Sequence, residues 1–151
     1  MLASLLGGEK MDYIDLANQL LDLRSRVPQI KMERTISEMG RGEVLVMNYL
    51  FSRKNKVYPK DISKALMLTT ARIAAILKNL EKHDMITRTQ DSLDNRQTVV
   101  ELTDTGLASI SIRREKVVQT TAKMLEALGE EDAKAYIRIQ KKLMNLEEVW
   151  K

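Results

Sequence analysis

The sequence predicts a mainly α fold with a minor β part, and three observations support this fold class. The chain is 44% hydrophobic but has one Phe and one Trp, so Leu, Ile, Val, Met and Ala must build the core, which favours helices. Apolar residues recur at three- and four-residue spacing along most of the chain. The exception is the stretch from Asp91 to Gly106. Its polar first half and β-branched second half predict a hairpin with Met85–Thr89 as partner strand.

Seven helices are expected around this hairpin, each with an apolar stripe or an apolar surface. Their expected ranges are 12–27, 29–39, 43–53, 59–66, 70–83, 104–128 and about 130–149. Pro28 ends the first helix because a residue before proline avoids the α region. Pro59 suits a first helical turn, Thr69 can cap the next helix, and Gly129 suits the end of the sixth. The helix at 43–53 is too apolar for the surface and is expected near the centre of the core.

The helices at 59–66 and 70–83 form a recognisable pair. They are joined by the short turn Met67-Leu68-Thr69. The second helix has a buried stripe of Ile73, Ile76, Leu77 and Leu80. The opposite face holds Ala71, Ala74, Ala75, Lys78 and Lys82, with Arg72 on one flank. Two short helices with such a small and basic outer face predict a helix-turn-helix, and the hairpin after it predicts a winged helix.

The positive charge is concentrated in this part of the chain. From Arg53 to Arg96 there are ten Lys and Arg against five Asp and Glu, an excess of +5 in a chain of net charge +4. This block fits a surface that binds a polyanion such as double-stranded DNA. It fits an ordinary solvated face equally well.

Several classes of function are disfavoured. The chain has no Cys and a single His, His83, so we expect no metal, no cofactor and no catalytic triad. We find no glycine-rich phosphate loop and no nucleophile–base pair, so no enzyme is expected. No apolar run approaches the ~18 residues of a membrane span. Met1–Leu6 makes a poor signal peptide, so a cytoplasmic protein without membrane contact is expected.

Three pieces of sequence carry a family resemblance. They are Leu80-Glu81-Lys82-His83-Asp84-Met85-Ile86-Thr87-Arg88, then Asp91-x-x-Asp94-x-Arg96, then Leu102-Thr103-x-x-Gly106. In this order, after a helix-turn-helix, they resemble the MarR family of bacterial winged-helix transcriptional regulators. The resemblance covers nearly the whole chain in element order and is strongest over 43–106. It implies an obligate, triangular homodimer on pseudo-palindromic DNA, modulated by a small ligand or an oxidant. Without Cys, thiol oxidation is excluded.

The resemblance also assigns roles to residues. Arg96 matches the wing arginine that enters the minor groove, and Asp94 the aspartate that steadies it. A carboxylate two residues away on the same face of a strand could hold the guanidinium by a bidentate pair. The sequence departs from the family at Ala74 and Ala75, where polar or basic residues are usual, and at Asp84, where glycine is usual.

Base reading must then come from Thr69, Thr70, Arg72 and Lys78, or from DNA shape. Lys54, Lys56, Lys60, Lys64 and Lys82 are simplest as phosphate contacts, and for each a solvated face is an equal alternative. The candidate DNA-binding residues are Thr69, Thr70, Arg72, Ala74, Ala75, Lys78, Lys82, Asp94 and Arg96.

The expected organisation is one structural domain with three parts. Residues 43–103 form the DNA-binding winged helix, and 1–42 and 104–151 form helices that pair with a second copy of the chain. The alternative is that the terminal helices pack on their own core. An effector could lie among Met32, Ile36, Met39 and Met47, with Arg34 or Arg41 for an acidic group; the alternative is that these methionines are core.

The function expected is a MarR-like, sequence-specific and ligand-responsive repressor that acts as a homodimer. The alternative is a winged-helix protein-interaction module that does not read DNA. The apolar pair Ala74 and Ala75 motivates this alternative, because such a helix face could meet a protein.

Overall fold

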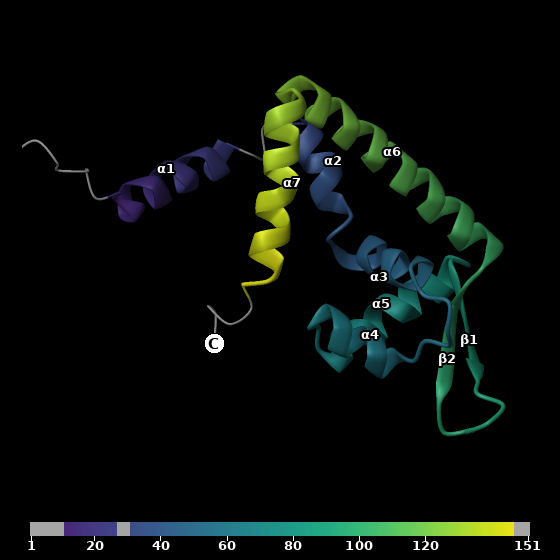
Figure 1. Cartoon of the computed structure of the whole chain (residues 1–151). Helices are drawn as coiled ribbons and strands as arrows, with labels where there is room; N and C mark the ends of the chain where they lie inside the picture. The colour runs from purple at the N-terminus through teal and green to yellow at the C-terminus, as the bar shows by residue number, and fades with distance from the viewer. Residues whose placement is uncertain (1–10, 27–30, 147–151) are drawn as a thin grey trace, which may run out of the picture.

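The computed structural model describes residues 11–26 and 31–146, with side chains described from Arg34 onward in the second range. The elements in order are α1 Tyr13–Arg26, α2 Lys31–Glu38, α3 Gly42–Phe51, α4 Pro59–Leu66, α5 Thr70–Lys82, β1 Ile86–Gln90, β2 Thr98–Leu102, α6 Asp104–Leu128 and α7 Glu130–Met144 (Figure 1). The mainly helical fold with one hairpin is confirmed. The expectations for Met1–Leu6, Val27, Pro28 and the side chain of Met32 lie outside the described residues.

One predicted boundary is wrong. The last helix was expected to reach about residue 149, but α7 ends at Met144. There the N–H of Asn145 donates to the carbonyl of Lys142 at 3.1 Å, an i→i−3 bond that tightens and closes the final turn. Apolar periodicity alone does not reveal such a stop, because Leu146 continues the apolar pattern after the helix has ended.

The core forms around α3, as its apolar sequence predicts. Val46, Met47 and Leu50 of this helix are buried. The rest of the buried cluster comes from α4, α5, the hairpin, the loop before α4 and α6, namely Ile62, Ile73, Leu77, Leu80, Ile86, Val100, Val57 and Ile110. All of these side chains come from residues 46–110, so one compact core holds the helix-turn-helix, the hairpin and the start of α6 together.

The hairpin is antiparallel and lies directly after α5. Ile86 pairs with Leu102 and Gln90 with Thr98 at the two ends of the ladder. The other edge of β2 is partly covered, because the N–H of Val100 donates to the carbonyl of Val57 at 2.9 Å. The loop before α4 therefore contacts the sheet as a short third segment.

A close contact fixes α6 against the hairpin. Thr103 caps α6 by accepting from the N–H of Gly106 at 2.9 Å, and its hydroxyl donates to the carbonyl of Asp84 at 2.5 Å. A Cβ at Gly106 would lie 1.9 Å from the carbonyl oxygen of Met85, so only glycine fits there. Asp84 adopts a left-handed φ of 56°, which accounts for the glycine that the resemblance leads one to expect at this turn.

The terminal helices are arranged differently. α6 runs away from the hairpin, and α2 and α7 pack along it near its far end (Figure 1). In α1 every residue from Tyr13 to Arg26 is exposed, and α7 has no buried residue. Within the described ranges, no helix is both long and apolar enough to cross a membrane.

Candidate nucleic-acid interface

Helix α5 presents the face that the sequence predicts. Ile73, Leu77 and Leu80 are buried, and Ile76 is half-buried. The candidate contact residues of this helix are all exposed, namely Thr70, Arg72, Ala74, Ala75, Lys78 and Lys82. α5 thus offers solvent a shallow, small-residue centre with cations around it.

Thr69 has the capping role that the sequence predicts. Its Oγ1 accepts from the N–H of Arg72 at 3.2 Å, which satisfies one of the unpaired amides of the first turn. The turn before Thr69 contains Met67 in a left-handed conformation with φ 51°.

The wing is the loop from Asp91 to Gln97, between the two strands. Arg96 is exposed in this loop. The expected pairing of Asp94 with the guanidinium is wrong: Oδ1 of Asp94 accepts from the backbone N–H of Arg96 at 3.0 Å, and Oδ2 from Nε2 of Gln97 at 3.2 Å. Both residues lie in the loop and not on a strand, so the nearest donors to the carboxylate are those of the turn itself. The carboxylate of Asp94 therefore holds the backbone N–H of Arg96 and not its guanidinium.

Asp91 at the start of the wing was not among the predicted site residues, yet it is the one buried polar or charged residue in the described ranges, with 3% of its surface exposed. Its carboxylate accepts from Nζ of Lys56 at 2.8 Å, Oη of Tyr58 at 2.5 Å and the N–H of Leu93 at 2.9 Å. The N–H of Leu93, followed by Lys56 and Tyr58, lowers the pKa of Asp91 well below its usual range. The hydrogen bond to this carboxylate raises the pKa of Tyr58.

Lys56 belongs to the Asp91 cluster. The sequence predicts Lys56 either as a phosphate contact or as a solvated cation, but its ammonium is paired with Asp91. The separation of 35 residues explains why sequence patterns did not reveal this pair. The local signal was the Asp91-Ser92-Leu93 turn, in which an aspartate can accept from the amide two residues on.

The remaining cations of the basic block differ in their surroundings. The ammonium of Lys60 lies 5.6 Å from the centre of the Tyr58 ring, and the guanidinium of Arg53 lies 4.5 Å from that of Tyr49. Arg88 of β1 pairs with Glu81 of α5, with Nε 3.0 Å from Oε2, which lowers the pKa of Glu81. Lys54, Lys64, Lys78 and Lys82 form no ion pair with any described residue.

A second wing residue that the sequence analysis did not single out is Leu93. It is 89% exposed, between the buried Asp91 and the turn that holds Arg96. Exposed Leu93 and exposed Arg96 give the wing loop both an apolar and a cationic side chain.

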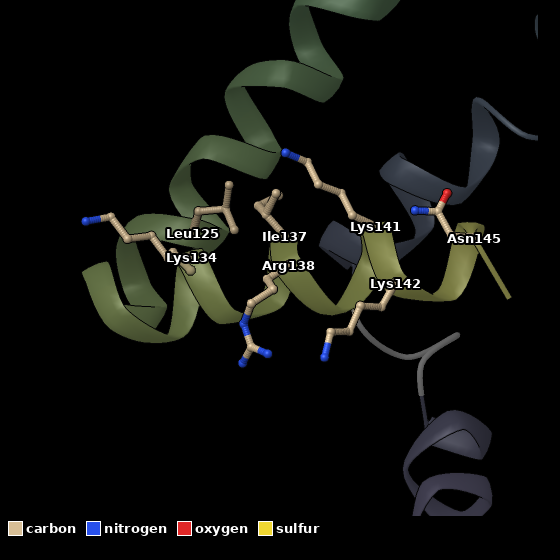
Figure 2. Close-up of a pocket in the computed structure, with 8 residues that line it drawn as sticks. Leu125, Lys134, Ile137, Arg138, Lys141, Lys142 and Asn145 are labelled. Carbon is tan, nitrogen blue, oxygen red and sulfur yellow. The ribbon is translucent and has the colours of Figure 1, made fainter.

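The methionines considered for an effector belong largely to the core. Met47 is buried, and Met39 packs against the core cluster. Near Met39, a cavity of about 60 Å³ is lined by Thr35, Glu38, Val44, Arg113, Lys116 and Val117. A larger pocket of about 580 Å³ lies along α7, with Leu125 as its lining residue from α6. Leu125 and Ile137 lie side by side in it, and Arg138 and Lys142 point away from them (Figure 2).

The helix-turn-helix of α4 and α5, followed by a hairpin whose loop carries the exposed Arg96, is a winged-helix fold. Residues 30–112, more than half of the chain, match the sequence model described as transcriptional regulator SarA/Rot. The chain belongs to this family of transcriptional regulators and is not an enzyme.

Three individual proteins resemble the chain, one in sequence and two in fold. The chain is 26% identical over 122 residues to the HTH-type transcriptional regulator YdgJ of Bacillus subtilis (strain 168), covering 80% of this chain and 73% of that protein. The fold matches MepR, a transcription regulator of the Staphylococcus aureus multidrug efflux pump MepA, with a TM-score of 0.65 at 20% identity over 91% of this chain and 100% of MepR. YusO from Bacillus subtilis matches with a TM-score of 0.65 at 21% identity, over 87% and 94% of the two chains.

Proposed function

We propose that the chain acts in the cytoplasm as a homodimer that binds double-stranded DNA sequence-specifically and represses transcription until a small ligand relieves it. The observation that carries the DNA-binding part is the exposed face of α5 next to the wing that bears Arg96. A solved S. aureus MepR–DNA complex with a TM-score of 0.60 over 90% of this chain supports it.

In this proposal α5 lies in the major groove. Ala74 and Ala75 allow a close approach and can contact thymine methyl groups. Thr69, Thr70, Arg72 and Lys78 supply the donors near base edges, and Lys82 contacts phosphate. The small number of side chains able to form bidentate bonds implies that DNA shape contributes much of the specificity.

The wing supplies the second contact. Arg96 enters the minor groove, whose negative potential is greatest where it is narrow. Asp94 holds the backbone of Arg96, and Leu93 beside it can contact the apolar sugar edges of the groove.

The dimer is supported by the exposed apolar residues of the terminal helices. α1 has exposed Ile14, Leu16, Leu20 and Leu23, and α7 has exposed Tyr136, Ile137, Ile139 and Leu143. Each helix is acidic in its first turn and basic in its last turn. Antiparallel packing of α1 on the partner's α7 would bury these faces and bring opposite charges together.

The exposed apolar faces also support a division of the chain into a DNA-binding winged helix, 43–103, and a dimerisation region made of 1–42 and 104–151.

Relief by a ligand is supported by the solved structure of S. aureus MepR bound to ethidium bromide, which matches this fold with a TM-score of 0.53.

The test is an electrophoretic mobility shift with duplex DNA from upstream of the chain's own gene and a scrambled duplex of equal length, at two salt concentrations. We expect preference for the first duplex, and a loss of about 1–3 kcal/mol for Arg96→Ala. Arg113→Ala is the matched control, because it removes the same charge from an exposed position of α6 outside the proposed interface.

Equal shifts on both duplexes would remove the claim of sequence specificity. If neither duplex shifts, the proposal fails, and the alternative of a winged-helix module that binds a protein gains support. An unchanged affinity for Arg96→Ala would show that the wing does not contact DNA.

A further inference from the structure

The buried carboxylate at the base of the wing joins two parts of the molecule that both face the proposed DNA. We propose that Asp91 is a positioning residue for DNA recognition, which fixes the wing to the start of the helix-turn-helix. This inference rests on the proposed DNA binding.

The bonds of Asp91 reach across the fold. Lys56 and Tyr58 lie in the loop between α3 and α4, 35 and 33 residues before Asp91 in the sequence. The bond from the N–H of Val100 to the carbonyl of Val57 ties the same loop to β2. The loop is therefore held at the start of the wing and at the strand that follows it.

Tyr58 passes this attachment to the helix-turn-helix. It is the N-cap residue of α4, and its N–H donates to Oδ2 of Asp61 at 3.1 Å. At the other end of α4, Oγ of Ser63 donates to the carbonyl of Leu68 at 2.6 Å, in the turn that leads into α5. The start of α4 is thus bonded to the base of the wing, and its second half is bonded to the turn that precedes α5.

On the wing side, Asp91 closes the loop that carries Arg96. The N–H of Asp91 donates to the carbonyl of Gln97 at 2.9 Å, and its carboxylate accepts from the N–H of Leu93. Asp94 then accepts from the N–H of Arg96 inside this closed loop. The orientation of Arg96 relative to α5 thus depends on Asp91.

Positioning and simple electrostatics predict opposite signs for Asp91→Asn. If Asp91 acted only as a negative charge, its loss would remove an anion and free the ammonium of Lys56, so DNA would bind more tightly. If Asp91 positions the wing, its loss weakens binding, because Arg96 must be ordered again on the DNA.

The experiment measures affinity for the duplex from upstream of the chain's own gene, using the full chain in four forms: wild type, Asp91→Asn, Arg96→Ala and the double variant. We expect Asp91→Asn to weaken binding about fivefold or more, and Arg96→Ala to cost a much smaller factor in the Asp91→Asn background than in wild type. Such coupling is not expected if Asp91 only stabilises the fold. Unchanged or tighter binding by Asp91→Asn, or additive effects of the two substitutions, would overturn the inference.

Lys56→Gln and Lys54→Gln form a matched pair in the same loop. We expect Lys56→Gln to cause little further loss of DNA affinity in the Asp91→Asn background, because the carboxylate that pairs with Lys56 is already absent there. Lys54→Gln should weaken wild type and Asp91→Asn by equal factors. If Lys56→Gln also acts equally in both backgrounds, Lys56 works independently of Asp91 and the inference is wrong.

Amide hydrogen exchange of the free protein tests the positioning without DNA. In Asp91→Asn, the amides of Leu93 and Gln97 should exchange at least tenfold faster, while those of Leu77 and Leu80 in α5 stay protected. Unchanged exchange in the wing would contradict the inference even if DNA binding were weakened.

The failure of this inference can be told apart from the failure of the proposed function. If wild type binds DNA and Arg96→Ala weakens that binding while Asp91→Asn does not, only this inference fails. If wild type does not bind, the proposed function fails together with it.

Discussion

The winged-helix part and the terminal helices are built from the same aliphatic residues but use them in opposite ways. In α5, Leu77 is 1% exposed and contributes to a core shared with α3, α4 and the hairpin. In α1, Leu20 is 54% exposed, and no described residue of that helix is buried. The winged-helix part buries its apolar side chains in its own core, whereas α1 leaves its apolar side chains exposed to solvent.

This difference shows that an apolar stripe determines which face of a helix is buried. It does not determine whether the same chain or a second copy covers that face. The stripe of α5 is covered because α3 and α4, which precede it in the chain, and β1, which follows it, pack against it. Among the described residues, α1 has no buried side chain, and α7 has none although it packs along α6, which is why we assign their apolar faces to a second copy.

The largest expected effect comes from substituting one leucine in each region. Leu77→Ala should reduce the free energy of unfolding by about 2–5 kcal/mol, because it leaves a cavity in a closed core. Leu20→Ala should reduce the free energy of unfolding only at protein concentrations at which the dimer forms. Urea unfolding at several protein concentrations separates them: the loss for Leu77→Ala is independent of concentration, and that for Leu20→Ala is not. A concentration-independent loss for Leu20→Ala would show that α1 packs within its own chain.

A smaller effect is expected from two glycines. Gly106→Ala forces a methyl group into the backbone of Met85 and should cost about 1–3 kcal/mol as the end of the hairpin and α6 move apart. Gly40→Ala is the matched control, because its added Cβ would meet the carbonyl of Ser37 at an ordinary 3.6 Å. Thermal unfolding of both variants checks this. Equal stability of the two would show that α6 is free to move on the hairpin.

The smallest effect concerns the wing, which polar bonds hold rather than apolar packing. The pKa of Asp91 is lowered in the folded protein, so its charged form contributes stability above the ordinary carboxyl pKa of about 4. That contribution is lost as the pH falls toward the lower pKa of the folded state. The stability difference between wild type and Asp91→Asn should be constant from pH 8 to 5 and smaller at pH 3, as measured by urea unfolding. A difference that is the same at pH 3 would show that the charge of Asp91 does not contribute.

Much of the fold was predictable because it is local. The ranges 59–66 and 104–128 agree with α4 and α6, since Pro59, Thr103 and Gly129 determine their ends through neighbouring amides and carbonyls. The exposed face of α5 follows from the periodicity of Ile73, Leu77 and Leu80. Arg96 in the wing loop follows from turn-forming residues around it. The DNA-binding roles of these residues stay predictions.

Only the tertiary structure decided which polar groups meet. Asp91 and Lys56 look like a wing carboxylate and a phosphate contact until the chain brings them together across 35 residues. Asp94 binds backbone amides because the wing is a closed turn, and α7 ends at Met144 although the apolar pattern continues. Periodicity and capping act over a few residues along the chain, so the sequence by itself determined the elements and their faces. Ion pairs and hydrogen bonds depend on distances through space, which exist only once those elements have packed.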